Sequence, residues 1–78
     1  MSRHVRAYDR GWRDASTVVQ AAIHTPGITQ QQMLTEYRAA IIAVKSNLQL
    51  SPRFRAGYIE YLQCAIQAIT THRWEVPA

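Results

Sequence analysis

Apolar side chains recur at alternating spacings of three and four residues along three segments of the chain, which is the period of an α-helix with one buried face. The pattern predicts helices over residues 4–24, 30–47 and 52–73, followed by a C-terminal tail over 74–78. Strict alternation of apolar and polar residues, the mark of a strand, is absent. In the first segment the apolar stripe consists of Val5, Tyr8, Trp12, Ala15, Val19 and Ala22.

The two breaks between these segments carry clear boundary signals. Pro26 is followed by glycine, a turn dipeptide that separates the first two helices. Thr29 and Gln32 have the spacing of a capping box, so the second helix should begin at residue 30. Ser51 and Pro52 read as an N-cap and a first helical position, and they predict the start of the third helix.

The second helix is expected to bury one narrow stripe. Ile28 and Met33 occupy the two positions of a hydrophobic staple at its start. The stripe itself follows a heptad pattern over Leu34, Tyr37, Ile41, Val44 and Leu48, and the solvent face carries Gln31, Glu36, Arg38 and Lys45.

The third helix is apolar over most of its circumference. Its coherent polar face is limited to Glu60, Gln63, Gln67 and Thr70. A helix with such a wide apolar surface is normally covered on two sides, so we expect it to be the central helix or to lie at a subunit interface.

With 78 residues there is room for one domain with a marginal core. Cys64 is the only cysteine, which excludes an internal disulfide and fits a reducing compartment. Small domains without such links often gain stability from a second subunit. We therefore expect an all-α fold, either a three-helix bundle or a helical hairpin with a swapped third helix, assembled as a homodimer. The expected dimer interface comprises Tyr58, Ile59, Leu62, Ile66 and Ile69.

One short pattern occurs twice. Residues 8–14 and 54–60 align without a gap, and each has two aromatic residues four apart, a glycine immediately before the second and an acidic residue two positions after it. Glycine within a helix costs about 1 kcal/mol relative to alanine, so something should offset that cost at Gly11 and Gly57. The favoured interpretation is a notch that admits a neighbouring helix, and the alternative is an aromatic pocket for a ligand or partner.

The first helix also carries a basic stripe. The chain has a net charge of +4, and eight of its nine basic residues are arginine. Helical spacing places the side chains of Arg3, Arg6, Arg10 and Arg13 together. Such a stripe can bind an acidic protein surface or nucleic acid phosphates, although Asp9 and Asp14 could pair with it locally and leave it a solvated face.

No motif indicates catalysis, and we expect neither an enzyme nor a cofactor. The three histidines lie far apart without ligand spacing, so no metal site is expected. Cys64 lies beside apolar residues, where a small buried hydrophobe is the usual role. No apolar run is long enough to span a bilayer, and no apolar segment typical of a secretory signal follows the N-terminus, so a cytoplasmic protein without membrane contact is expected.

These observations predict a small protein-binding module whose partner has an acidic surface. The expected contact residues are Arg3, Arg6, Arg10, Arg13, Tyr8 and Trp12. In size and in its lack of catalytic residues the chain resembles small phage-encoded proteins that bind and inhibit a host protein, a resemblance of type that assigns no residue role. One alternative is a nucleic-acid-binding protein that uses the same arginines. Another is a binder of a small anion, such as a nucleotide, near Arg53 and Arg55 at the start of the third helix.

Overall fold

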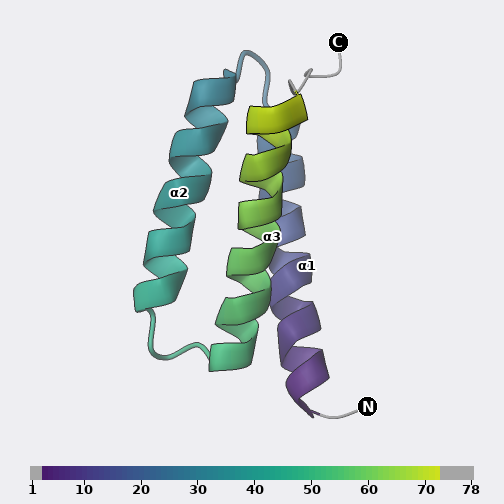
Figure 1. Ribbon diagram of the computed structural model, residues 1–78, viewed down its shortest axis with the longest axis vertical. Helices are drawn as coiled ribbons and strands as arrows, with labels where there is room; N and C mark the ends of the chain where they lie inside the picture. Colours follow the sequence, from purple (N-terminus) through teal and green to yellow (C-terminus); the bar gives the residue numbers. More distant parts are fainter. Residues whose placement is uncertain (1–2, 73–78) are drawn as a thin grey trace.

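The computed structural model describes residues 3–72 and shows three helices joined by two short turns (Figure 1). Helix α1 spans Arg3–Ile23, α2 spans Gln30–Ser46 and α3 spans Pro52–His72. Each bound lies within one residue of the range expected from the sequence, and the three-helix architecture is confirmed. The side chains of residues 3–5 and 72, and the predicted tail over 74–78, lie outside the described part.

The chain runs up along α1, down along α2 and up again along α3, so α1 and α3 are parallel (Figure 1). Helix α3 packs against both other helices, whereas α1 and α2 have few contacts with each other. The wide apolar surface of α3 is therefore covered on two sides within one chain. This confirms α3 as the central helix of the bundle.

The predicted caps form at both inner boundaries. The Gln32 amide donates to the Thr29 hydroxyl at 3.1 Å, and the Thr29 amide donates to the side-chain oxygen of Gln32 at 2.8 Å, completing the capping box. The Phe54 amide donates to the Ser51 hydroxyl at 3.1 Å. In the first turn Gly27 has φ 76°, a left-handed conformation that glycine adopts without strain. Local chemistry thus sets where α2 and α3 begin.

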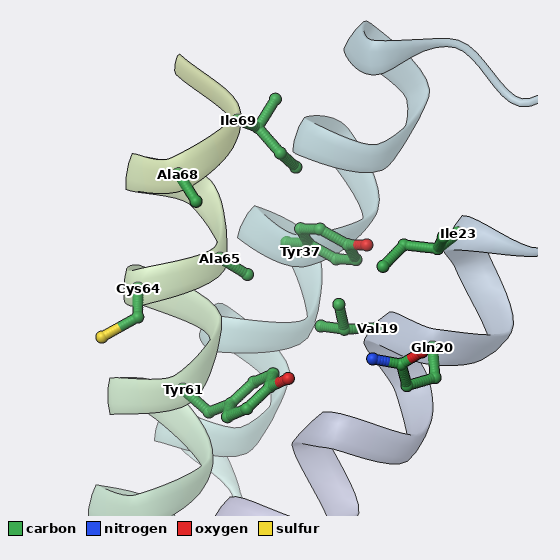
Figure 2. Close-up of a pocket in the computed structure, with 9 residues that line it drawn as sticks. All are labelled: Val19, Gln20, Ile23, Tyr37, Tyr61, Cys64, Ala65, Ala68 and Ile69. Atoms are coloured by element: carbon green, nitrogen blue, oxygen red, sulfur yellow. The ribbon is translucent and has the colours of Figure 1, made fainter. Parts of the chain in front are cut away.

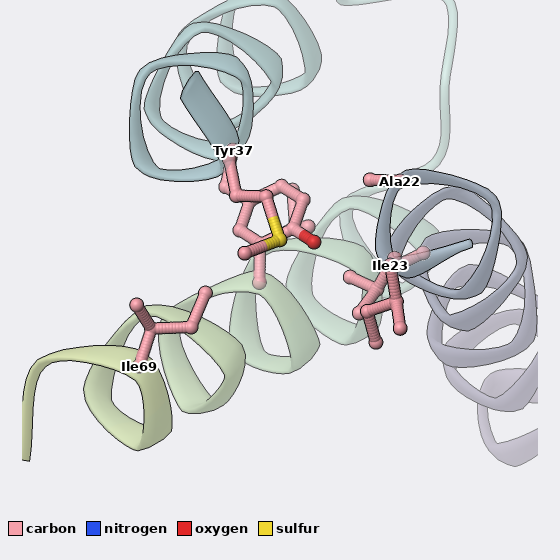
Figure 3. Packing of buried hydrophobic residues seen from close by; sticks show 8 residues of the cluster. Ala22, Ile23, Tyr37 and Ile69 are labelled. Carbon is pink, nitrogen blue, oxygen red and sulfur yellow. The ribbon is translucent and has the colours of Figure 1, made fainter. Parts of the chain in front are cut away.

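The core lies between the C-terminal half of α1, the start of α2 and the second half of α3 (Figure 3). Met33, Tyr37 and Leu62 are its largest fully buried side chains. Complete burial of side chains of this size stabilises a fold by about 1.5–3 kcal/mol each. The other buried hydrophobic residues are Ala15, Val19, Ala22, Ile23 and Ile69.

One position of the predicted α2 stripe is wrong. Leu48 is 82% exposed, because α2 ends at Ser46 and Asn47 caps it with extended backbone. The heptad pattern therefore runs past the end of the helix that would carry it. The predicted solvent face of α2 is confirmed, since Gln31, Glu36, Arg38 and Lys45 are all exposed.

Candidate functional site

The two aromatic-glycine segments pack against each other where α1 and α3 cross. A Cβ atom at Gly11 would collide with the carbonyl oxygen of Phe54 and lie 3.0 Å from the amide nitrogen of Tyr58. Both neighbours are backbone atoms, which cannot move aside as a flexible side chain can. Only glycine at position 11 therefore allows the two backbones to approach this closely.

The contact is reciprocal. A Cβ atom at Gly57 would collide with the carbonyl oxygen of Tyr8 and lie 3.1 Å from the amide nitrogen of Trp12. The neighbours of Gly57, Tyr8 and Trp12, align with the neighbours of Gly11, Phe54 and Tyr58. The parallel helices α1 and α3 are therefore related here by a local pseudo-twofold axis. The predicted notch is confirmed, and the helix that fills each notch is the other copy of the pattern.

The aromatic rings repeat the same symmetry. The rings of Tyr8 and Trp12 stack with centroids 6.2 Å apart, and those of Phe54 and Tyr58 stack at 6.1 Å. In addition, Trp12 meets Tyr61 edge to face at 4.9 Å. Tyr8 and Trp12, which the sequence assigned to partner binding, are half-buried and take part in this packing.

The acidic residue of each copy lies near an aromatic residue of the other helix. A hydrogen bond to Glu60 stabilises the neutral phenol and, with partial desolvation and the carboxylate charge, raises the pKa of Tyr8 to about 12. Burial, followed by the negative charge of Asp14, raises the pKa of Tyr58. The repeated acid thus belongs to the contact between α1 and α3, whereas the sequence pattern suggested only that Asp14 could pair with arginines of its own helix.

The arginine stripe faces away from the bundle. Arg6, Arg10 and Arg13 are all exposed, on the side of α1 opposite Ala15 and the rest of its core-facing stripe. The structure brings these three guanidinium groups onto one outer surface, which we call the basic face. The side chain of the fourth predicted residue, Arg3, lies outside the described part.

The residues predicted for a dimer interface have different environments. Leu62 and Ile69 belong to the core of the single chain, with 0% and 3% of their surface exposed. Tyr58, Ile59 and Ile66 are half-buried. Leu62 and Ile69 therefore have almost no surface left for contact with a second copy of the chain. The dimer remains a prediction, and its interface would have to use Tyr58, Ile59 and Ile66.

The arginines at the start of α3, predicted for an anionic ligand, also differ from each other. Arg53 is exposed, whereas Arg55 is half-buried and donates through Nη1 to the carbonyl oxygen of Lys45 at 3.4 Å. Arg55 thus satisfies a carbonyl near the C-terminus of α2. Its role in the structure is to link α2 to α3.

A cavity of about 280 Å³ lies beyond the glycine crossing, between the C-terminal halves of α1 and α3 (Figure 2). Val19, Gln20 and Ile23 form its α1 wall, and Tyr61, Cys64, Ala65, Ala68 and Ile69 form its α3 wall. Tyr37 reaches in from α2. The sequence indicated Tyr37 as a core residue, but no local signal could show that it would line a cavity between two other helices.

Cys64 is exposed at this cavity, which contradicts the small buried hydrophobe expected from its apolar neighbours.

Within residues 3–72 no three potential metal ligands come together. None of the helices, over the residues described, has an apolar stretch long enough to cross a membrane.

Comparison of the chain with protein-family models, with characterised proteins and with solved structures gives no match.

Proposed function

We propose that the protein is a non-enzymatic module that binds an acidic protein surface through the basic face of α1. The observation that carries this proposal is the exposure of Arg6, Arg10 and Arg13 together on the side of the helix that faces away from the core. Side chains placed there contribute no burial to the fold, so they are free to contact a partner. Arginine forms bidentate hydrogen bonds with carboxylates, which suits an acidic partner.

The dimensions and the neighbours of the basic face favour a protein over nucleic acid. At about 1.5 Å of rise per residue, Arg6 and Arg13 lie about 10 Å apart along the helix, a length that covers few phosphates. Asp9 and Asp14 flank the arginines on α1 and would repel a continuous phosphate backbone. A protein surface with separate acidic side chains can alternate with this pattern.

The test begins with cross-linking and affinity purification from the source cells, followed by binding measurements on the purified partner. Replacing all three residues, Arg6→Glu, Arg10→Glu and Arg13→Glu, should weaken binding by at least about a hundredfold, because charged hydrogen bonds contribute about 1.5–3 kcal/mol each. The matched control is Arg38→Glu, Lys45→Glu and Arg53→Glu, which changes the net charge equally at exposed sites elsewhere. Equal losses in the two triple variants would contradict the proposal.

A second binding measurement replaces the partner with duplex DNA at low salt. The proposal expects weak binding that the two triple variants reduce alike. Tight binding with a steep salt dependence, lost only in the α1 variant, would instead establish the nucleic acid alternative.

The predicted homodimer is tested separately by sedimentation equilibrium. A dimer that uses the half-buried residues of α3 should dissociate when Ile59→Glu is introduced. A monomer at all concentrations would show that burial within one chain is sufficient for α3.

A further inference from the structure

The cavity between α1 and α3 arises from a change in how the two helices pack. At Gly11 and Gly57 their backbones touch, and towards the C-terminal ends the helices separate (Figure 3). Side chains from α2 enter the space between them from one side. On the other side small residues, Ala65 and Ala68, leave the cavity unfilled.

Local pseudosymmetry explains why only one side is filled. Helix α2 packs against α3, where Leu62 belongs to the same core cluster as Met33 and Tyr37 of α2 and Ile66 packs against that cluster. The aligned positions on α1 are Ser16 and Gln20, whose polar side chains offer a helix no comparable apolar surface. The equivalent groove on the opposite face of the α1–α3 pair is therefore open, and the cavity lies in it.

An unsatisfied polar atom lies buried beneath the lining of this cavity. Tyr37 has 0% of its surface exposed, and its hydroxyl has no hydrogen-bond partner among the residues described. In Figure 2 the hydroxyl lies between the cavity walls and points towards Ile23. A buried polar group without a partner costs about 1–3 kcal/mol, so a ligand that supplies one recovers this free energy.

The hydroxyl is available as a donor under ordinary conditions. Burial, followed by the charge of Glu36 and the neighbouring Tyr61, raises the pKa of Tyr37, so the phenol remains protonated at neutral pH. The lining is otherwise mainly apolar. A ligand therefore needs one hydrogen-bond acceptor and a hydrocarbon body.

We propose that this cavity binds a compact apolar molecule with a single hydrogen-bond acceptor, such as an aromatic ketone, and that side chains of the lining move aside so that the acceptor pairs with the buried Tyr37 hydroxyl. The size follows from the volume of about 280 Å³, since an apolar cavity of about 150 Å³ holds benzene. The hydrocarbon part packs against Val19, Ala65 and Ala68. This site is distinct from the basic face, and neither proposal depends on the other.

The test uses two probes of nearly equal shape, acetophenone, which has an acceptor, and ethylbenzene, which has none. Their dissociation constants are measured by NMR titration of the ¹³C,¹⁵N-labelled protein, with wild type and Tyr37→Phe compared. Ethylbenzene is the more hydrophobic molecule, so the informative quantity is the ratio of the two constants. Removal of the hydroxyl should shift that ratio against acetophenone by about tenfold, the value of one hydrogen bond.

Two further variants localise the effect. Tyr61→Phe removes a second hydroxyl from the cavity and should leave the ratio as in wild type. Ala68→Leu narrows the cavity and should weaken the binding of both probes alike, while circular dichroism shows an unchanged helical fold. The proposal is overturned if the ratio is the same in wild type and Tyr37→Phe, if Tyr61→Phe produces the shift instead, or if neither probe perturbs the cavity residues.

Discussion

The two halves of the α1–α3 pair show how glycine and alanine at a helix contact lead to different results. In the N-terminal half, Gly11 and Gly57 bring backbone against backbone and leave no room for a methyl group. In the C-terminal half, Ala65 and Ala68 lie on α3 where it has separated from α1, and they line a cavity. A small residue in a helix therefore indicates close helix–helix packing only where the neighbouring helix lies near enough to contact its backbone.

Substitution of the two glycines gives the largest expected effect. Gly11→Ala and Gly57→Ala should each lower the free energy of unfolding by about 3 kcal/mol, because overpacking against backbone exceeds the gain of about 1 kcal/mol in helix propensity. Chemical denaturation monitored by circular dichroism measures the change.

The matched control adds a larger group to the open half. Ala68→Leu should change the free energy of unfolding by less than about 1 kcal/mol, because the cavity accepts the added atoms. Glycine variants as stable as wild type, or a larger loss of stability in Ala68→Leu, would contradict close packing at the glycines and open space at Ala68.

Removal of the buried hydroxyl gives a smaller effect of opposite sign. Tyr37→Phe should raise the free energy of unfolding by up to about 1 kcal/mol, since it deletes a buried polar group that makes no hydrogen bond. The same denaturation experiment measures it. A clear loss of stability would show that the hydroxyl has a partner in the folded protein.

The smallest expected effect is a change in the pKa of Tyr8, in the N-terminal half of the α1–α3 pair. Tyr8 should titrate near pH 12, and Glu60→Gln should return its pKa towards 10. Because the folded-state pKa lies above the unfolded value, the stabilisation from Glu60 is complete below pH 10 and is lost as the pH rises towards 12.

Absorbance at 295 nm follows this titration, and the difference between wild type and Tyr8→Phe isolates the one tyrosine. A Tyr8 pKa that is unchanged by Glu60→Gln would contradict the contact between α1 and α3 at this point.

The parts of the fold that the sequence predicted are those set by local chemistry. The capping box at Thr29 and the N-cap at Ser51 depend on residues at most three positions away. The outward direction of Arg6, Arg10 and Arg13 follows from helical period alone. The same reasoning failed at Leu48, because the heptad pattern continues past Ser46 although the helix ends there.

The parts that could not be predicted depend on residues distant in the sequence. The pattern at Gly11 indicated a notch, but nothing local identified Gly57 and its neighbours as the occupant. The cavity requires the separation of α1 and α3 and the entry of Tyr37 from α2, two features that no single segment encodes. The aligned repeat was a usable signal, because two copies of one notch can fill each other in parallel helices.

The reciprocal crossing of α1 and α3 is tested most directly by nuclear Overhauser effects at the two glycines. The parallel, reciprocal crossing predicts cross-peaks from the Gly11 α-protons to the amide proton of Tyr58, and from the Gly57 α-protons to that of Trp12. Observation of both sets would establish the pseudo-twofold contact. Cross-peaks from Gly11 to the C-terminal turns of α3 instead, or from only one of the glycines, would contradict it.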